Sequence, residues 1–174
     1  RSESQTDIQA KAAAYGVLLY IVSNAFVKAL LFLTAGRLRA VYGTNDVKAL
    51  SGVIRVLPFS GLLFAVGTFA LLGFPPFGSF FGELLILSAL VTSGHLYVFS
   101  TFCLVITITF IATGRTIFPM IWGAPQQVRT WPRQTLLAGS PKIAFFVVLI
   151  ALGLYLPPTI TGLLEQVAAS LEGP

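Results

Sequence analysis

A tyrosine, an asparagine and a lysine recur at four-residue spacing within an apolar stretch of the chain, at Tyr20, Asn24 and Lys28. Residues four apart share one face of an α-helix, so these side chains are expected to form a polar stripe, with Ser23 beside it. A hydroxyl, an amide and an amine in one line can order water and pass protons. Asn24 alone also has a simpler interpretation, a hydrogen bond that holds a neighbouring helix.

Lys28 is the most informative member of this stripe because it lies inside a segment long enough to cross a membrane. The apolar run from Ala12 to Gly36 has about the length needed to cross a hydrocarbon core of about 30 Å. A charged side chain at that depth costs about 3 kcal/mol on insertion scales. Apolar residues continue beyond Lys28, so a buried polar pathway explains it better than an amine that reaches the interface.

A helix break is predicted further along the chain. Pro75 and Pro76 lack N–H donors and clash with a continuing helix. Irregular backbone at membrane depth must be buried in protein or line a wet cavity, although a plain interfacial loop would also fit the prolines. Close backbone approach around the break is allowed by three glycines, Gly73, Gly78 and Gly82.

Glu83 supplies a second ionisable group just after this break. If a helix begins at Pro76 near the membrane surface, Glu83 lies roughly 10 Å into the bilayer. Lys28 and Glu83 are therefore predicted proton carriers, with water bridging a spacing too wide for a direct bond. An inert Lys28–Glu83 ion pair is the alternative.

Five apolar segments must position these residues, and the composition agrees with a membrane protein. Hydrophobic residues make up 56% of the chain and charged residues 10%, against about 25% charge in a soluble domain. The sequence predicts an all-α membrane protein with a discontinuous helix at Pro75–Pro76, in a single transmembrane domain over residues 1–174. Residues 1–11 are expected to be an exposed N-terminal segment and residues 123–142 a Pro-rich loop. The five segments are Ala12 to Leu38, Val56 to Phe74, Pro76 to Val91, Leu96 to Trp122 and Ile143 to Leu164.

Basic residues concentrate between the apolar segments, which favours lipid headgroups and neighbouring subunits as partners over nucleic acid. If each segment crosses once, one face receives Arg1, Lys11, Arg115, Arg129, Arg133 and Lys142. The opposite face receives Arg37, Arg39, Lys48 and Arg55. The excess of basic residues on the first face predicts a cytoplasmic N-terminus, in an integral membrane protein of a prokaryotic inner membrane.

The sequence contains no group of residues suited to bond-making catalysis. Cys103 is the only cysteine and His95 the only histidine, so neither a disulfide nor a metal cage is expected. No cofactor is expected in this chain. Threonines of the fourth segment could line a water path, although bonds to the carbonyl four residues back are the commoner arrangement; they are Thr101, Thr107, Thr109 and Thr113.

The two polar sites occur in an order that resembles a known family. The stretch NAFVKALLFLTAG, from Asn24 to Gly36, resembles the H-A-x-x-K-A-L-L-F-L-x-A-G signature of antiporter-like membrane subunits. These subunits belong to respiratory complex I, multisubunit cation/proton antiporters and energy-converting nickel–iron hydrogenases. The stretch LGFPPFGSFFGE, ending at Glu83, is similar to the broken-helix motif of that family. The resemblance implies that Lys28 is a central relay lysine and Glu83 an exit-side proton carrier.

Within the family, residues 118–125 and 153–158 look most like the large membrane subunit of membrane-bound hydrogenases. Asn24 stands where the family has histidine, and an amide can hold water but cannot carry a proton by titrating. The resemblance covers only the C-terminal portion of a fold built from two inverted repeats. The first repeat is therefore expected from another chain or from elsewhere in the same protein.

The sequence thus predicts a subunit that moves protons or sodium ions through a hydrated path including Lys28 and Glu83. Its expected partners are other membrane subunits of a redox-driven complex, among them a chain that supplies the missing first repeat, and lipids. Such a complex would be an oxidoreductase, although no catalytic site lies in this chain. Two alternatives are a non-conducting assembly subunit and a part of a cation/proton antiporter without redox coupling.

Overall fold

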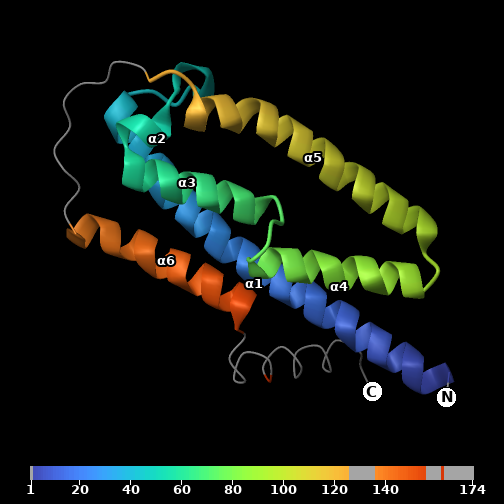
Figure 1. The fold of residues 1–174 in the computed structure, drawn as a ribbon. Helices are drawn as coiled ribbons and strands as arrows, with labels where there is room; N and C mark the ends of the chain where they lie inside the picture. Colours follow the sequence, from blue (N-terminus) through green and yellow to red (C-terminus); the bar gives the residue numbers. More distant parts are fainter. Residues whose placement is uncertain (1, 126–135, 156–161, 163–174) are drawn as a thin grey trace.

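The computed structural model describes residues 2–125, 136–155 and Gly162, and these residues contain helices and no strands (Figure 1). Two helices, α5 and the part of α1 from Ala10 to Tyr42, are long and apolar enough to cross a membrane. The predicted all-α fold is confirmed. The elements are α1 (Ser2–Tyr42), η1 (Val47–Ala49), α2 (Val53–Val56), α3 (Pro58–Leu71), α4 (Gly78–Thr92), α5 (Leu96–Trp122) and α6 (Leu136–Leu154).

Helix boundaries differ from the predicted ones towards both ends of the chain. Helix α1 begins at Ser2, so the polar residues up to Lys11 continue the first span instead of forming a separate segment. Helix α6 begins at Leu136, so the last part of the predicted Pro-rich loop is helical, with Pro141 inside the helix. Arg1, residues 126–135 and, apart from Gly162, the predicted continuation of the last span over 156–164 lie outside the described residues.

Helices α3 and α4 lie one after the other along α1, and both run antiparallel to it (Figure 1). The facing pairs along α1 are Gly16 with Leu85, Tyr20 with Gly82, Ser23 with Gly78, and Leu31 with Gly67. With 14 residues α3 is about 21 Å long, and with 15 residues α4 is about 22 Å long. Each helix is shorter than a hydrocarbon core of about 30 Å, whereas the two together are long enough to span it.

The apolar segments on either side of Pro75–Pro76 are therefore two halves of one discontinuous crossing. This arrangement agrees with the predicted discontinuous helix. Counted in this way, the described helices make four successive crossings, instead of the five that were assumed in assigning basic residues to two faces. The physical reason is that apolar runs reveal length but not direction. Direction is set by the short connection after Gly73, which leads the chain onward along α1 instead of turning it back.

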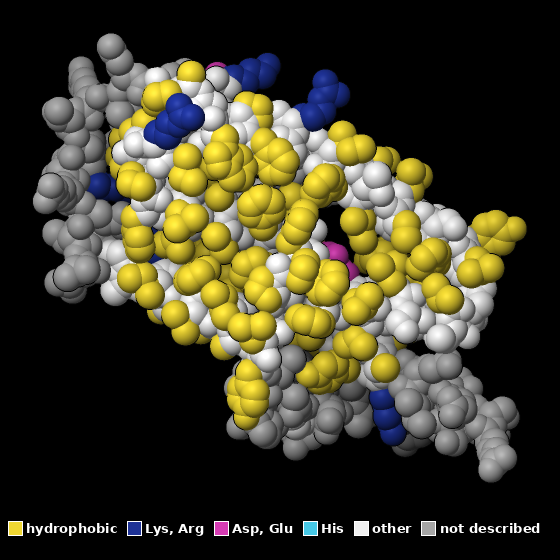
Figure 2. All heavy atoms as spheres, viewed as in Figure 1, with side chains coloured by type: hydrophobic (Ala, Val, Ile, Leu, Met, Phe, Trp, Pro, Cys, Tyr) yellow, Lys and Arg dark blue, Asp and Glu magenta, His cyan; other side chains and the backbone are white. Residues whose placement is uncertain are grey.

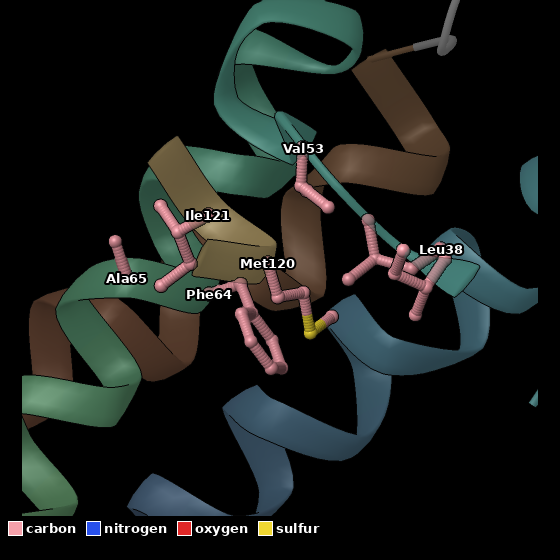
Figure 3. Packing of buried hydrophobic residues seen from close by; sticks show 7 residues of the cluster. Leu38, Val53, Phe64, Ala65, Met120 and Ile121 are labelled. Atoms are coloured by element: carbon pink, nitrogen blue, oxygen red, sulfur yellow. The ribbon is translucent and has the colours of Figure 1, made fainter. Parts of the chain in front are cut away.

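Helix α5 leads the chain back to the α2 end of the molecule and is anchored at its C-terminal end (Figure 1). Met120 and Ile121 are buried in a hydrophobic cluster with residues of α1, α2 and α3, including Leu38, Val53, Phe64 and Ala65 (Figure 3). Just beyond α5, Pro125 packs so closely against Gly52 that there is no room for a side chain at position 52. The 18-residue apolar stretch of α5 contains no buried residue, and Figure 1 shows α5 running apart from α3 between its ends.

Helix α6 packs on the other side of α1 and runs from the start of α3 to the helix break. Its Phe145 ring lies 5.9 Å from the Phe26 ring of α1, measured between centroids. Its Leu149 joins a second buried cluster made by α1, α3 and the break. Helix α6 therefore packs against the break on the α4 side, where Phe77 is buried, while Pro75 and Pro76 stay exposed in the described chain. The other members of that cluster are Val27, Leu30, Leu63, Ala70 and Phe77.

Candidate proton-transfer site

Helix α3 ends in a Schellman turn centred on Gly73. The Gly73 N–H donates to the Ala70 carbonyl at 3.3 Å, and the Phe74 N–H donates to the Phe69 carbonyl at 3.1 Å. Gly73 has a φ of +69°, the left-handed conformation that this motif requires and that glycine adopts without strain. The Phe69 and Phe74 rings meet edge to face at 5.3 Å, the apolar contact that accompanies such a turn. Local sequence therefore determines where α3 stops.

The start of α4 is tied back to the end of α3 across the break. The Ser79 hydroxyl is buried and donates to the Ala70 carbonyl at 2.6 Å. The Ala70 carbonyl in the last turn of α3 thus accepts a second hydrogen bond besides the one from the Gly73 N–H. Side-chain hydrogen bonds of this kind contribute about 0.6–1.7 kcal/mol inside membrane proteins.

Neighbouring helices close around the break through small residues. Gly78 packs on the Ser23 hydroxyl of α1, and Gly153 of α6 packs on the Pro76 carbonyl. A side chain at either glycine would overlap these atoms, so both approaches require glycine. These contacts bury the α4 side of the break, from Phe77 to Ser79, whereas Phe74, Pro75 and Pro76 are exposed among the described residues.

Glu83 turns back from α4 onto the break. Its carboxylate lies against Gly73, where a Cβ atom would collide with Oε2. The side chain is half-buried and close enough to Tyr20 for its charge to act on the phenol. The structure thus brings three predicted site residues together: Tyr20 of the polar stripe, Gly73 of the break and Glu83.

Lys28 lies on another side of the break and faces a cavity of about 530 Å³ between α1, α3 and α5. Thr68 and Leu71 of α3 and Thr113 of α5 also line this cavity. Lys28 is exposed in this chain, so the described residues do not supply the burial that the sequence predicted for it. The reason is that α5 stands away from α1 and α3 at this level.

Lys28 and Glu83 do not form an ion pair in the described part of the chain, which agrees with the predicted wide spacing. Lys28 instead lies beside the last turn of α3, at Leu71. The C-terminal end of a helix carries unpaired carbonyls and a partial negative charge, which stabilise a cation. Asn24, one turn before Lys28, is half-buried. The stripe on α1 therefore runs from Tyr20 beside Glu83, past the break, to Lys28 at the cavity.

The threonines of α5 mostly bond to their own helix. The Thr101 hydroxyl donates to the Tyr97 carbonyl, and the Thr107 hydroxyl donates to the Cys103 carbonyl. For these two residues the simpler interpretation is confirmed. Thr113 differs because it lines the cavity that Lys28 faces.

Some residues that shape the site are not evident from sequence. Ser79 and Gly153 look like ordinary small residues in apolar helices, and only the fold brings them to the break. Lys142 could have been found, because it is flanked by the apolar runs 136–139 and 143–154. Interpreting Pro141 as the end of a loop hides the fact that Lys142 belongs to α6.

These observations define a helical membrane subunit with ionisable groups at a helix break. Residues 5–112 match the model of the family described as "NADH:quinone oxidoreductase/Mrp antiporter, TM". This match covers more than half of the chain, and the chain belongs to this family of antiporter-like membrane subunits. The predicted family is confirmed, as is the prediction of an integral membrane protein.

Individual relatives come from respiratory and antiporter complexes. NADH-ubiquinone oxidoreductase chain 4 of Chondrus crispus is 35% identical over 75% of this chain and 23% of its own length. An Na⁺/H⁺ antiporter subunit of Alkalihalophilus pseudofirmus is 28% identical over 82% of this chain and 30% of its own length. An NADH-quinone oxidoreductase subunit of Campylobacter jejuni is 29% identical over 81% of this chain and 24% of its own length. The chain thus spans less than a third of the length of these relatives.

Proposed function

We propose that this chain carries part of a path for protons, or for sodium ions, through a multisubunit membrane complex. The observation that carries the proposal is the helix break, because it holds the Glu83 carboxylate against Gly73 beside Tyr20. Lys28 faces a cavity on the α3 side of the same break. Ionisable groups at membrane depth are costly, and they mark ion and proton pathways more often than structural positions.

Each half of the path has a distinct role in this proposal. Lys28 holds a proton at the negative end of α3, and Glu83 accepts one at the start of α4. Water in the cavity and hydroxyl groups such as Tyr20 would connect the two groups, since no direct bond joins them. A proton arriving at Lys28 changes the charge near the break, which favours its release from a neighbouring group.

The direction of the path follows from the distribution of basic residues over the four crossings. The end of the molecule with α2 carries six described basic residues, whereas Lys11 lies at the opposite end. Figure 2 shows basic side chains gathered mainly at the α2 end of the visible face. The positive-inside tendency puts the α2 end in the cytoplasm, which reverses the orientation predicted from five alternating crossings. The six residues are Arg37, Arg39, Lys48, Arg55, Arg115 and Lys142.

The proposal is tested in the assembled complex by replacing the two ionisable residues. Lys28→Ala and Glu83→Gln are expected to lower ion translocation per turnover at least tenfold, measured by dye quenching in inverted membrane vesicles. Lys48→Gln is the matched control, because it removes an exposed basic residue from the connection between α1 and α2. Normal translocation in both Lys28→Ala and Glu83→Gln vesicles would refute the proposal.

The same test separates the alternatives. An assembly subunit would lose complex formation, or nothing at all, when Lys28 is replaced, and translocation per assembled complex would stay unchanged. An antiporter without redox coupling is supported by the relationship to the Na⁺/H⁺ antiporter subunit of Alkalihalophilus pseudofirmus, and it predicts cation-dependent proton movement without an electron donor. The closer resemblance to hydrogenase subunits and the prokaryotic membrane stay predictions, as does a partner that supplies the first repeat.

A further inference from the structure

The cavity that Lys28 faces is open towards the outside of the described helices. Lys28 is exposed, and so are Phe32 and Ala35, which line the same wall of the cavity on α1. The exposed fraction of Phe32 reaches 76%. Within the described chain, Lys28 forms neither a hydrogen bond nor an ion pair through its side chain. The cavity thus combines free apolar surface with one positive charge that has no partner among the described residues.

The opposite wall of the cavity is uncovered as well. Thr113 and Thr116 of α5 line it, and the 18-residue apolar stretch of α5 contains no buried residue. The last turn of α5 is nevertheless held in place, because Met120 and Ile121 are buried in a cluster with α1, α2 and α3. Helix α5 is therefore anchored beside a space of about 530 Å³ that a further element can enter.

The charge on Lys28 argues against acyl chains as the element that fills this space. Lys28 lies well inside the candidate membrane span from Ala10 to Tyr42. Charged residues at such a depth are costly beside lipid, and they almost always face a bundle interior or a water-filled cavity. Water of the proposed ion path also needs a wall that separates it from lipid, and in this respect the inference rests on the proposed function. A wall inside the bilayer must satisfy its own backbone groups, which a helix does.

The remaining length of an antiporter-like subunit can supply this helix. The chain spans 23–30% of the length of three relatives from its transmembrane family. More than two thirds of each relative therefore corresponds to protein outside this chain.

Lys28 also indicates the chemistry of the helix. It is the only charged residue among those that line the cavity in the described chain. Glu83, the acidic residue of α4, lies against Gly73 at the break and does not pair with it. Ionisable residues inside membranes pair with one another, so the complementary group is a carboxylate.

We propose that the open side of this cavity is the docking surface for a transmembrane helix from the part of an antiporter-like subunit outside this chain, and that this helix presents an aspartate or a glutamate to Lys28. The helix packs between α5 and the wall formed by α1 and α3. It closes the cavity towards lipid and places its acidic residue at the level of Lys28 and Thr113.

The test places the photoreactive amino acid p-benzoylphenylalanine at Phe32 on α1 and at Thr113 on α5 in the assembled complex. After irradiation, both positions are expected to cross-link to one transmembrane peptide from outside this chain that contains an acidic residue. Ile111 is the matched control, because it is exposed on α5 and lies about 200° around the helix from Thr113. The yield of this cross-link should be at least about fivefold lower from Ile111 than from Thr113.

The charge is tested on the acidic residue that the cross-link identifies. Lys28→Ala, and replacement of that acidic residue by its amide, should each lower the yield from Phe32 about fivefold. The two changes together should lower it no further, because each removes the same ion pair.

Three results would overturn the proposal. Cross-links from Phe32 and Thr113 to lipid alone would show that acyl chains fill the cavity. Cross-links between α1 and α5 alone would show that α5 itself closes it. A cross-linked helix without an acidic residue, or full independence of the two substitutions, would exclude the pairing with Lys28. Cross-linking does not require ion movement, so an intact cross-link in a complex that translocates no ions would count against the proposed function alone.

Discussion

Replacing Gly82 with alanine tests the packing that presents Glu83 to the break. A Cβ atom at Gly82 would lie 2.8 Å from the Gly16 carbonyl oxygen and 2.9 Å from the Tyr20 nitrogen. Both atoms belong to the backbone of α1, so no side-chain rotation can relieve the overlap. Restoring an ordinary contact of 3.4 Å requires α1 and α4 to separate by about 0.6 Å. Overpacking of this kind costs about 1–3 kcal/mol.

Gly36→Ala is the matched control for this substitution. Gly36 lies in α1, and a Cβ atom there would meet nothing within 4 Å. Both substitutions gain the helix propensity of alanine, about 1 kcal/mol, so their difference isolates the overpacking at Gly82. The free energy of unfolding in mixed detergent micelles should therefore be about 1–3 kcal/mol lower for Gly82→Ala than for Gly36→Ala.

Equal unfolding free energies for the two variants would show that the α1–α4 contact is not tight, and the placement of Glu83 beside Tyr20 would lose its basis. A functional measurement adds to this test. In the assembled complex, Gly82→Ala should lower ion translocation while Gly36→Ala leaves it unchanged, because only the first moves Tyr20 away from α4.

Three further predictions concern the break and the four crossings. Gly73→Ala should destabilise the chain by at least about 1 kcal/mol more than Gly43→Ala, measured by the same unfolding assay. Both glycines have φ near +70°, but only at Gly73 would the new methyl group meet another side chain. Ser79→Ala should lower the free energy of unfolding by about 1 kcal/mol, and no change would mean that its hydroxyl does not tie the two half-helices together. Single cysteines at Asn45 and Ala124, in a background without the native cysteine, should react with a membrane-impermeant thiol reagent from the same side of the membrane. Reaction from opposite sides would show that the chain makes five separate crossings.

The helical class and the helix break could be predicted from sequence because they depend on local chemistry. Apolar length predicts spans, and adjacent prolines prevent a continuing helix whatever surrounds them. The boundaries of α5, from Leu96 to Trp122, were predicted to the residue. Its first turn follows the Ser93–His95 connection and its last turn precedes Gly123, so local signals mark both ends.

The direction of the chain after the break was not predictable in the same way. An interfacial turn and a buried interruption have similar sequences around Pro75 and Pro76. The difference arises from contacts that are distant in sequence, namely Gly78 against Ser23 and Gly153 against the Pro76 carbonyl. Without these pairs, the sequence supports both five crossings and four.

The sequence indicated which residues belong to the site, but it did not indicate how they are arranged in space. The helical spacing of Tyr20 and Lys28 places them on one face of α1, as predicted, yet the two meet different neighbours. Tyr20 lies beside Glu83, whereas Lys28 faces the cavity under α5. Figure 2 shows a gap beside α5 with an acidic side chain at its margin. Which neighbour each polar residue meets depends on the path of α5, and that path leaves little trace in the sequence.

The broken crossing also constrains how the protein is made. Neither α3 nor α4 is long enough to be retained in the bilayer as an independent span, so the two halves must enter it together. The connection between them exposes backbone groups that lipid cannot satisfy until Gly78 and Gly153 have docked on α1 and α6. Because α6 follows the break in the chain, the break must wait until α6 has been synthesised. During biosynthesis this segment therefore depends on a protected environment, such as the insertion machinery or a partner subunit, until α6 has been added.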